Sequence, residues 1–332
     1  MHLSMSLTTL ALLIGLSLTF DFLNGFHDAA NSIATVVSTG VLRPYQAVAW
    51  AAFFNFVAFA IFKLNVAATV GTGILAPELV DARIISSALA GAIVWDLITW
   101  YYGLPTSSSH ALIGGMIGAG LAKSGTAALV PAGIWKTVAF IIISPLLGLL
   151  CGALLMIAIS WIFFRRSPYL VDQWFRRLQL ASSALYSIGH GSNDAQKTMG
   201  LIWLILISAG RTSRAHLPMW VVASCYTAMA LGTLFGGWRI VRTMGQRITK
   251  LKPVGGFAAE AGGAMTLFLA SSLGVPVSTT HTITGAIVGV GATRRVSAVR
   301  WGLAGNIVVA WIITIPAAAL IATVAWWISS GA

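Results

Sequence analysis

Apolar residues come in long runs along this chain, separated by short polar gaps. A helix needs about 20 apolar residues to cross the hydrocarbon core of a bilayer. Runs of about this length recur seven times, which predicts a polytopic, all-α membrane protein. The runs lie near residues 7–23, 46–62, 84–102, 135–164, 219–238, 255–274 and 301–327.

Four further stretches are too short or too polar to be simple membrane spans, although each contains apolar residues. They lie near 24–42, 105–122, 185–210 and 277–293, and they carry most of the polar chemistry. Counting all of these segments, we expect about 10–12 transmembrane or re-entrant helices, some of them broken near the midplane of the bilayer.

Two polar motifs occur twice, in the same order and at a similar interval. The segment from Pro105 to His110 matches the segment from Pro276 to His281, and residues 26–31 match residues 192–197. Self-similarity of this kind indicates internal duplication. We therefore divide the chain into a first repeat over 1–164, a cytoplasmic basic connector over 165–180 and a second repeat over 181–332.

The composition supports the membrane assignment and excludes a nucleic-acid partner. Apolar residues make up 58% of the chain and charged residues only 8%, whereas soluble domains have about 25% charged residues. The net charge of +12 comes from basic residues in the gaps between apolar runs, which is typical of membrane topology rather than of a DNA-binding face. Cys151 and Cys225 lie inside apolar runs with no disulfide or metal-ligand spacing, so we expect no bound metal.

The placement of the basic residues also predicts an orientation. If each repeat crosses the membrane five times and the N-terminus is outside, the basic residues favour the cytoplasmic side by about two to one. An odd number of crossings makes the two repeats inverted, an architecture of many secondary transporters. We expect a multi-pass protein of the inner (plasma) membrane with both termini outside.

Several acidic residues fall at membrane depth, where each costs about 2.5–3.5 kcal/mol on insertion scales. Asp28 and Asp194 occupy matching positions in the two repeats, and a helix cap need not recur in this way. Carboxylates are hard ligands suited to H⁺ or Na⁺, so these two are candidate coupling-cation residues. For Asp21 and Asp96, a helix-capping role and a functional role both stay open.

The Pro-Ser/Thr-His motifs predict helices that begin inside the membrane. Proline disfavours a continuous helix, Ser and Thr cap helix N-termini, and the free N–H groups there attract anions. Two such helix starts meeting would surround a tetrahedral oxyanion with donors; the alternative is a pair of Pro-kinked helices whose hydroxyls bond to their own backbone. The candidate anion-binding hydroxyls are those of Ser107, Ser108, Ser109, Ser278, Thr279 and Thr280.

Together these motifs resemble the PiT family of inorganic phosphate transporters. The resemblance rests on GFHDAANSIATVVSTGVL, HGSNDAQKTMGLI, GLPTSSSHALIGG, GFAAEAGGAM and GVPVSTTHTITGA, and it spans nearly the whole chain. It implies phosphate uptake with H⁺ or Na⁺, inverted repeats and a homodimer, with no further cofactor. His27 stands where the family usually has Asn, which favours protons, and Lys197 stands where the first repeat has Asn31.

The resemblance and the motifs together define three groups of candidate residues. For phosphate, Asn31, Gln196 and Lys197 join the six hydroxyls. For the coupling cation, the candidates are Asp28, Asp194, Asn193, Asn24 and Glu260. For proton relay, or merely for orienting neighbouring groups, the candidates are His27, His110, His190 and His281.

The sequence therefore favours a secondary active symporter that imports inorganic phosphate, free or as a metal–phosphate complex. A sulfate permease would present similar donors, but phosphate near neutral pH keeps an O–H that an aspartate can accept. A channel would show flux without accumulation. A membrane-embedded hydrolase would need a defined nucleophile–base geometry, and duplicated motifs in opposite orientations do not favour one, so we expect no enzymatic activity.

Overall fold

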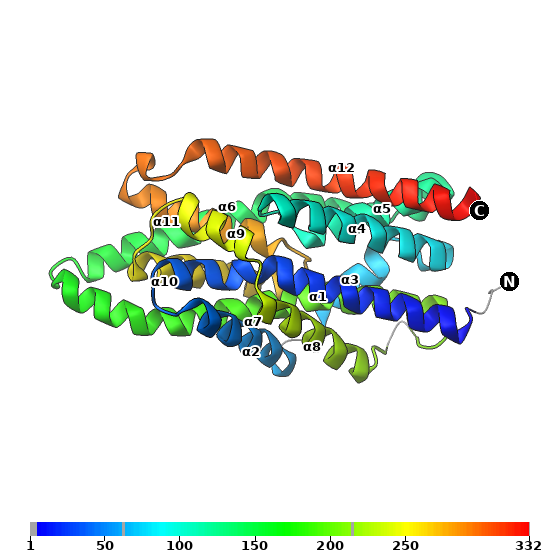
Figure 1. Cartoon of the computed structure of the whole chain (residues 1–332), viewed down its shortest axis with the longest axis horizontal. Helices are drawn as coiled ribbons and strands as arrows, with labels where there is room; N and C mark the ends of the chain where they lie inside the picture. The colour runs from blue at the N-terminus through cyan, green and yellow to red at the C-terminus, as the bar shows by residue number, and fades with distance from the viewer. Residues whose placement is uncertain (1–4, 62–63, 214–215, 332) are drawn as a thin grey trace.

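The computed structural model describes residues 5–61, 64–213 and 216–331, which form a bundle of long helices (Figure 1). In these ranges there is no β-strand beyond an isolated bridge between Leu75 and Leu129. The α-helices are α1 (Leu7–Ser38), α2 (Pro44–Val57), α3 (Asn65–Gly73), α4 (Ala82–Tyr102), α5 (Ser108–Ser124), α6 (Pro131–Ile162), α7 (Pro168–Ser208), α8 (Met219–Phe235), α9 (Trp238–Arg242), α10 (Pro253–Ser272), α11 (Thr279–Arg294) and α12 (Trp301–Gly331).

Five of the described helices, α1, α4, α6, α10 and α12, are long and apolar enough to cross a membrane. Two bent pairs bring the number of candidate spans to seven. One pair joins Pro44–Ala60 to Asn65–Gly71 at 86°, and the other joins Met219–Phe235 to Trp238–Arg247 at 62°. The protein is thus a multi-pass, all-helical membrane protein with broken helices, as the apolar runs predicted.

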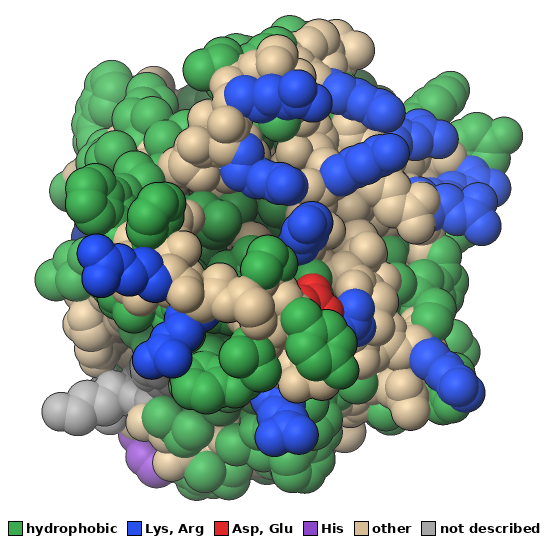
Figure 2. Space-filling view, turned by 90° about the vertical axis from the view of Figure 1, so that its left-hand side faces the viewer, with side chains coloured by type: hydrophobic (Ala, Val, Ile, Leu, Met, Phe, Trp, Pro, Cys, Tyr) green, Lys and Arg blue, Asp and Glu red, His purple; other side chains and the backbone are tan. Residues whose placement is uncertain are grey.

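The two ends of the bundle differ in charge. The described chain begins and ends at the same end of the bundle (Figure 1), and Lys and Arg side chains crowd the opposite end (Figure 2). Basic residues there also tie the connecting segments together. Arg176 Nη1 donates to Gly40 O at 3.2 Å, and Arg294 Nη1 donates to Lys250 O at 3.5 Å. The distribution matches the predicted gathering of basic residues on one side of the membrane.

Two of the short polar segments are not separate elements. Residues 24–38 continue α1 without a break, and residues 185–208 form the second half of the 41-residue α7. The predicted connector over 165–180 is also largely helical, because α7 begins at Pro168. Polar side chains at membrane depth do not interrupt these helices since neighbouring helices supply their hydrogen-bond partners.

The capping interpretation of Asp21 and Asp96 is wrong. Asp21 lies in the middle of α1 and Asp96 in the second half of α4, and both are buried. A cap must stand at the first residue of a helix, where N–H groups are free. Neither aspartate therefore has a helix terminus to satisfy.

Two helical hairpins, α4–α5 and α10–α11, share the same turn. Gly103 (φ 67°) and Gly274 (φ 64°) adopt the left-handed conformation that favours glycine. The next residue bonds back in both hairpins, from Leu104 N to Thr99 O and from Val275 N to Ala270 O, each at 2.9 Å. This bond closes the preceding helix and sends the chain into the Pro-Ser/Thr segment. The structure therefore contains two true helix starts instead of two kinked helices.

Glycines let the second helix of each hairpin press against a long helix. A Cβ at Gly118 of α5 would lie 2.1 Å from Ala319 O of α12, and one at Gly285 of α11 would lie 2.1 Å from Pro145 O of α6. Only residues without a side chain allow backbones to approach so closely. Each helix start is consequently held in place by its packing along the rest of the helix.

Candidate functional site

The two Pro-Ser/Thr-His motifs meet in the interior of the protein. Ser107 Oγ caps α5 by accepting from His110 N at 3.3 Å, and Ser278 Oγ caps α11 by accepting from His281 N at 3.1 Å. The rings of His110 and His281 lie edge to face with centroids 4.7 Å apart. The helix starts of the two repeats therefore stand side by side, as an anion site between them requires.

Polar atoms around these helix starts lack partners within the described structure. They are Ser108 Oγ, Thr106 Oγ1, His110 Nδ1 and both ring nitrogens of His281, all buried. Leaving a buried polar group unsatisfied costs about 1–3 kcal/mol. Such a concentration of unsatisfied groups marks a place where a polar ligand supplies the missing bonds.

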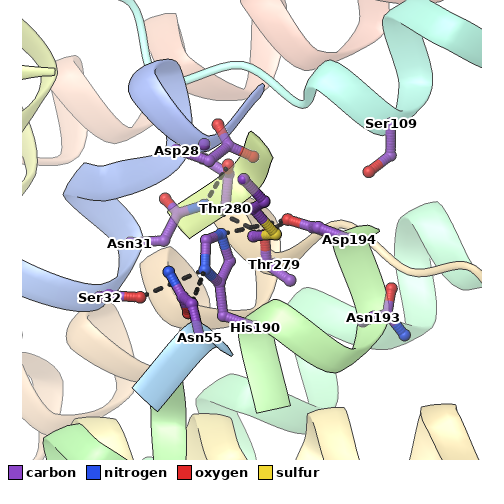
Figure 3. A network of polar contacts seen from close by, with 12 residues as sticks. Asp28, Asn31, Ser32, Asn55, Ser109, His190, Asn193, Asp194, Thr279 and Thr280 are labelled. Carbon is purple, nitrogen blue, oxygen red and sulfur yellow. Dashed lines mark hydrogen bonds and ion pairs between the residues drawn. The ribbon is translucent and has the colours of Figure 1, made fainter. Parts of the chain in front are cut away.

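The acidic residues of the two repeats also converge. Asp28 of α1, and His190 and Asp194 of α7, offer ligand atoms that all lie within 4.8 Å of one another, and Figure 3 shows the three side chains facing a common point. Two carboxylates so close need a positive charge between them. Asp28 and Asp194 were predicted from the sequence as coupling-cation residues, and this geometry is able to hold a cation.

Asp194 already has a permanent counter-charge. Lys197 Nζ lies 2.5 Å from Asp194 Oδ1, and the Thr279 hydroxyl donates to Asp194 Oδ2 at 2.8 Å. The same ammonium donates to Ser109 Oγ at 2.5 Å and to Val277 O at 2.6 Å. Lys197 therefore uses all three of its protons and ties α7 to both hairpins.

Asp194 Oδ2 also lies 3.2 Å from His190 Nε2, whereas the basic partner of Asp28 in the described structure is a histidine and not a lysine. His27 Nδ1 lies 2.7 Å from Asp28 Oδ1, and His27 Nε2 lies 3.1 Å from the Thr99 hydroxyl. The Thr99 hydroxyl also reaches Trp95 O at 3.0 Å and Asp96 O at 3.2 Å. It can donate to a neutral imidazole, or turn to a carbonyl and accept from a protonated one, so both protonation states of His27 are hydrogen-bonded.

Side chains of the first repeat bind those of the second directly. Asn31 Nδ2 of α1 donates to the hydroxyls of Thr279 and Thr280 at 3.1 and 2.9 Å. The Tyr186 hydroxyl of α7 donates to Thr279 O at 2.9 Å. The start of α11 is thus fixed by both α1 and α7, which carry the two aspartates.

Two of the predicted ligand side chains, those of Gln196 and Asn193, bind backbone groups of the protein. Gln196 Oε1 accepts from the backbone N–H groups of Val66 and Ala67 at 3.0 and 3.3 Å, which caps the start of α3. Asn193 Nδ2 donates to Val275 O, and its Oδ1 accepts from Val277 N, both at 3.2 Å. Both amides hold neighbouring backbone in place, and Asn193 does so at the α10–α11 turn.

Glu260 belongs to a separate polar network. Its Oε1 accepts from the Thr35 hydroxyl at 2.6 Å and from Gln179 Nε2 at 3.0 Å, and its Oε2 accepts from the Ser182 hydroxyl at 2.5 Å. Thr35 lies two helical turns beyond Asp28 on α1. The structure therefore does not bring Glu260 into the group formed by Asp28, His190 and Asp194.

Sequence reasoning missed four residues of the site. Ser32 Oγ and Asn55 Oδ1 contact His190 Nδ1 at 3.3 and 3.2 Å, and Thr99 and Tyr186 hold His27 and α11 as described. Asn55 was detectable as an amide in the middle of the apolar run 46–62. The others are common residue types in membrane helices, and only their spatial neighbours distinguish them.

Comparisons with known proteins agree with one another. A family model described as the phosphate transporter family matches residues 24–322. A probable low-affinity inorganic phosphate transporter of Rhizobium meliloti (strain 1021) is 62% identical over 316 residues, covering 95% of each chain. A protein of the same description from Bacillus subtilis (strain 168) is 44% identical over 320 residues, covering 96% of each chain. A solved structure titled the sodium-dependent phosphate transporter aligns with a TM-score of 0.86 at 27% identity, covering 98% of this chain and 99% of that one.

Proposed function

This chain belongs to the phosphate transporter family, and from that premise we propose that it is a secondary active symporter that imports inorganic phosphate with H⁺ or Na⁺. It is a transporter and not an enzyme. A single observation carries the mechanism: the starts of α5 and α11 meet beside the two aspartates, with Lys197 contacting both hairpins.

Phosphate would bind at the paired helix starts. Two helix N-termini and the nearby Lys197 ammonium supply positive potential, and the unsatisfied Ser108 hydroxyl and His281 ring supply polar atoms for its oxygens. Phosphate near neutral pH also keeps a proton that needs an acceptor. Asp28 or Asp194 offers one, which favours phosphate over sulfate.

The coupling cation would bind at Asp28. Lys197 already balances Asp194, so the pair of aspartates retains one uncompensated negative charge unless His27 or His190 is protonated. One proton or one Na⁺ neutralises this charge. Loading then changes the charge of the site, and entry of a divalent anion against an inside-negative potential, opposed by about 2.3 kcal/mol per charge per 100 mV, becomes less costly.

The choice between the two ions rests on opposing observations. His27 is hydrogen-bonded in either protonation state, which favours a proton, whereas the similar solved structure is titled sodium-dependent. We propose further that the chain works as a homodimer in the inner membrane with both termini outside, and that phosphate enters free or as a metal–phosphate complex.

Uptake of labelled phosphate into proteoliposomes tests the function. The purified protein is exposed to an imposed proton gradient, a sodium gradient or neither, with sulfate as competitor. We expect accumulation under one gradient and its loss in Asp28→Asn. Uptake that persists after every ion gradient is collapsed would contradict coupling, and equilibration without accumulation would indicate a channel.

A further inference from the structure

Asp21 has no basic partner. It lies in α1 seven residues before Asp28, about 10 Å along the helix axis, and its side chain is 0% exposed. Its described hydrogen bond comes from the Thr198 hydroxyl of α7 to Oδ1 at 2.9 Å. The ion pairs of the described residues do not include it. Nothing in the described structure therefore balances its charge.

One oxygen of this carboxylate and the side-chain oxygens of two neighbouring residues are buried without a hydrogen-bond partner. They are Asp21 Oδ2, Asn24 Oδ1 and the hydroxyl oxygen of Tyr226. The side chains of Asn24 and Tyr226 are only 2% and 1% exposed. Asn24 interacts with the Asp21 carboxyl group, and Tyr226 lies within electrostatic reach of it. The thiol of Cys225 also faces Asp21, and Ser192 and Gln196 lie next to the Tyr226 hydroxyl. These are polar neighbours with no formal charge opposite to that of a carboxylate.

The packing of α1 against α8 fixes these oxygens in place. A Cβ at Gly25 would lie 2.2 Å from Met229 O, and a Cβ at Gly232 would lie 1.9 Å from Phe22 O. The two backbones are as close as glycine allows, and neither helix is able to shift toward the other. Ligand oxygens on α1 and α8 are consequently held in place before any ligand arrives.

We propose that Asp21, Asn24, Thr198 and Tyr226 form a binding site for one sodium ion, separate from the cation position at Asp28. One carboxylate, one amide and two hydroxyl oxygens are hard ligands, as an alkali cation requires. A single formal negative charge matches a monovalent ion. Asp194 has Lys197 as its basic partner, so the negative charge available to a cation at this site is that of Asp21.

Asp21 and Asn24 lie on the part of α1 that runs to Asp28 from the end of the bundle where the described chain begins and ends (Figure 1). Along α1, Asp21 therefore lies nearer to that end than Asp28 does. Occupancy of the site does not require phosphate, so the inference goes beyond the proposed transport function and does not depend on it.

Equilibrium binding of radioactive sodium to the purified protein tests this site. The assay contains no phosphate, is kept mildly alkaline, and uses choline to hold the ionic strength constant. We expect Asp21→Asn to bind one Na⁺ fewer per chain than the wild type. The control is Asp172→Asn, an exposed carboxylate that pairs with Arg176 at 2.8 Å, and it should keep the wild-type number of ions.

Tyr226→Phe provides a second variant that keeps the aromatic packing. Loss of one ligand oxygen should weaken the Asp21-dependent component of binding by about tenfold, the equivalent of 1.4 kcal/mol. If Asp21→Asn does not fold, the affinity of Tyr226→Phe for Na⁺ tests the proposal without it. Wild-type protein that binds no Na⁺, or an Asp21→Asn variant with undiminished stoichiometry, would overturn the proposal; so would unchanged binding in Tyr226→Phe. Failure of phosphate uptake in proteoliposomes would leave this result intact.

Discussion

The matching aspartates of the two repeats differ in the charge that balances them. Asp194 contacts the ammonium of Lys197, which is bonded to both hairpins, and also lies next to His190. Asp28 contacts His27, and imidazole is the side chain whose unperturbed charge changes between pH 5 and 8, whereas an unperturbed lysine is charged throughout that range. A duplicated framework has thus acquired one permanent ion pair and one adjustable pair.

This difference indicates that the two aspartates have different roles, one structural and one in coupling. The permanent pair keeps the starts of α5 and α11 together whether or not the transporter is loaded. The adjustable pair allows the charge of the site to change between loaded and empty states, as coupling requires. The same substitution at Asp28 and at Asp194 should therefore have different effects.

The largest expected effect is on folding stability. Asp194→Asn leaves the buried Lys197 ammonium unpaired, and breaking a buried pair in this way costs about 3–5 kcal/mol. Asp28→Asn should cost much less, because His27 can release its proton. Thermal unfolding of the purified variants in detergent measures both changes. Equal destabilisation by the two substitutions would contradict the distinction between the pairs.

The next effect concerns the identity of the coupling ion. His27→Asn replaces the titratable partner with the residue that the family usually has at this position. We expect proton-driven accumulation of phosphate to fall sharply while any sodium-driven component persists. Lys197→Asn is the matched substitution in the second repeat, and it should abolish accumulation under either gradient. Proteoliposome uptake under each gradient measures the difference, and an unchanged response of His27→Asn to protons would refute a role of His27 in coupling.

A smaller effect is expected at Thr99, which contacts His27 from α4. Thr99→Val keeps the shape of the side chain but leaves His27 Nε2 without its partner, and an unsatisfied charged donor costs more than an unsatisfied neutral acceptor. The proton affinity of His27 should fall, so proton-driven uptake should need a more acidic medium. The pH profile of uptake tests this. Thr137→Val, whose hydroxyl bonds to Gly133 O within α6, is the control and should leave the profile unchanged.

The smallest effect is expected at the contact between the repeats. Thr280→Val removes one of the two hydroxyls that accept from Asn31, a loss of about 0.5–1.5 kcal/mol. Half-maximal phosphate uptake should then need several-fold more phosphate. Thr282→Val is a suitable comparison, since the Thr282 hydroxyl bonds to the backbone of Ser278. Equal effects in both variants would mean that Asn31 does not position Thr280.

Much of the architecture could be predicted from periodicity and motifs. The apolar runs located most of the long helices, and the Pro-Ser/Thr-His motifs located the starts of α5 and α11. The continuity of α1 and α7 could not be predicted, because their polar residues look like breaks in an apolar pattern. Only neighbouring helices show that those residues are satisfied inside unbroken helices.

The candidate site shows the same limit. Duplication identified Asp28 and Asp194. The family resemblance grouped Gln196 and Asn193 with them, although both amides bind backbone. For Asp21, the sequence did not decide between a structural and a functional role. Sequence alone allowed it to be a helix cap, whereas its place in mid-helix among unsatisfied oxygens excludes that role.

The sequence by itself determined the membrane environment, the helical type of the elements, the duplicated motifs and the residue types available for chemistry. These follow from local composition and spacing, since hydrophobic length and helix capping act over neighbouring residues. Tertiary structure decided which polar groups face each other: His27 with Thr99, Lys197 with Ser109, and Asn31 with Thr279 and Thr280. Those contacts join residues far apart in the chain, and they are fixed by how closely glycine-bearing helices pack, which no local pattern encodes.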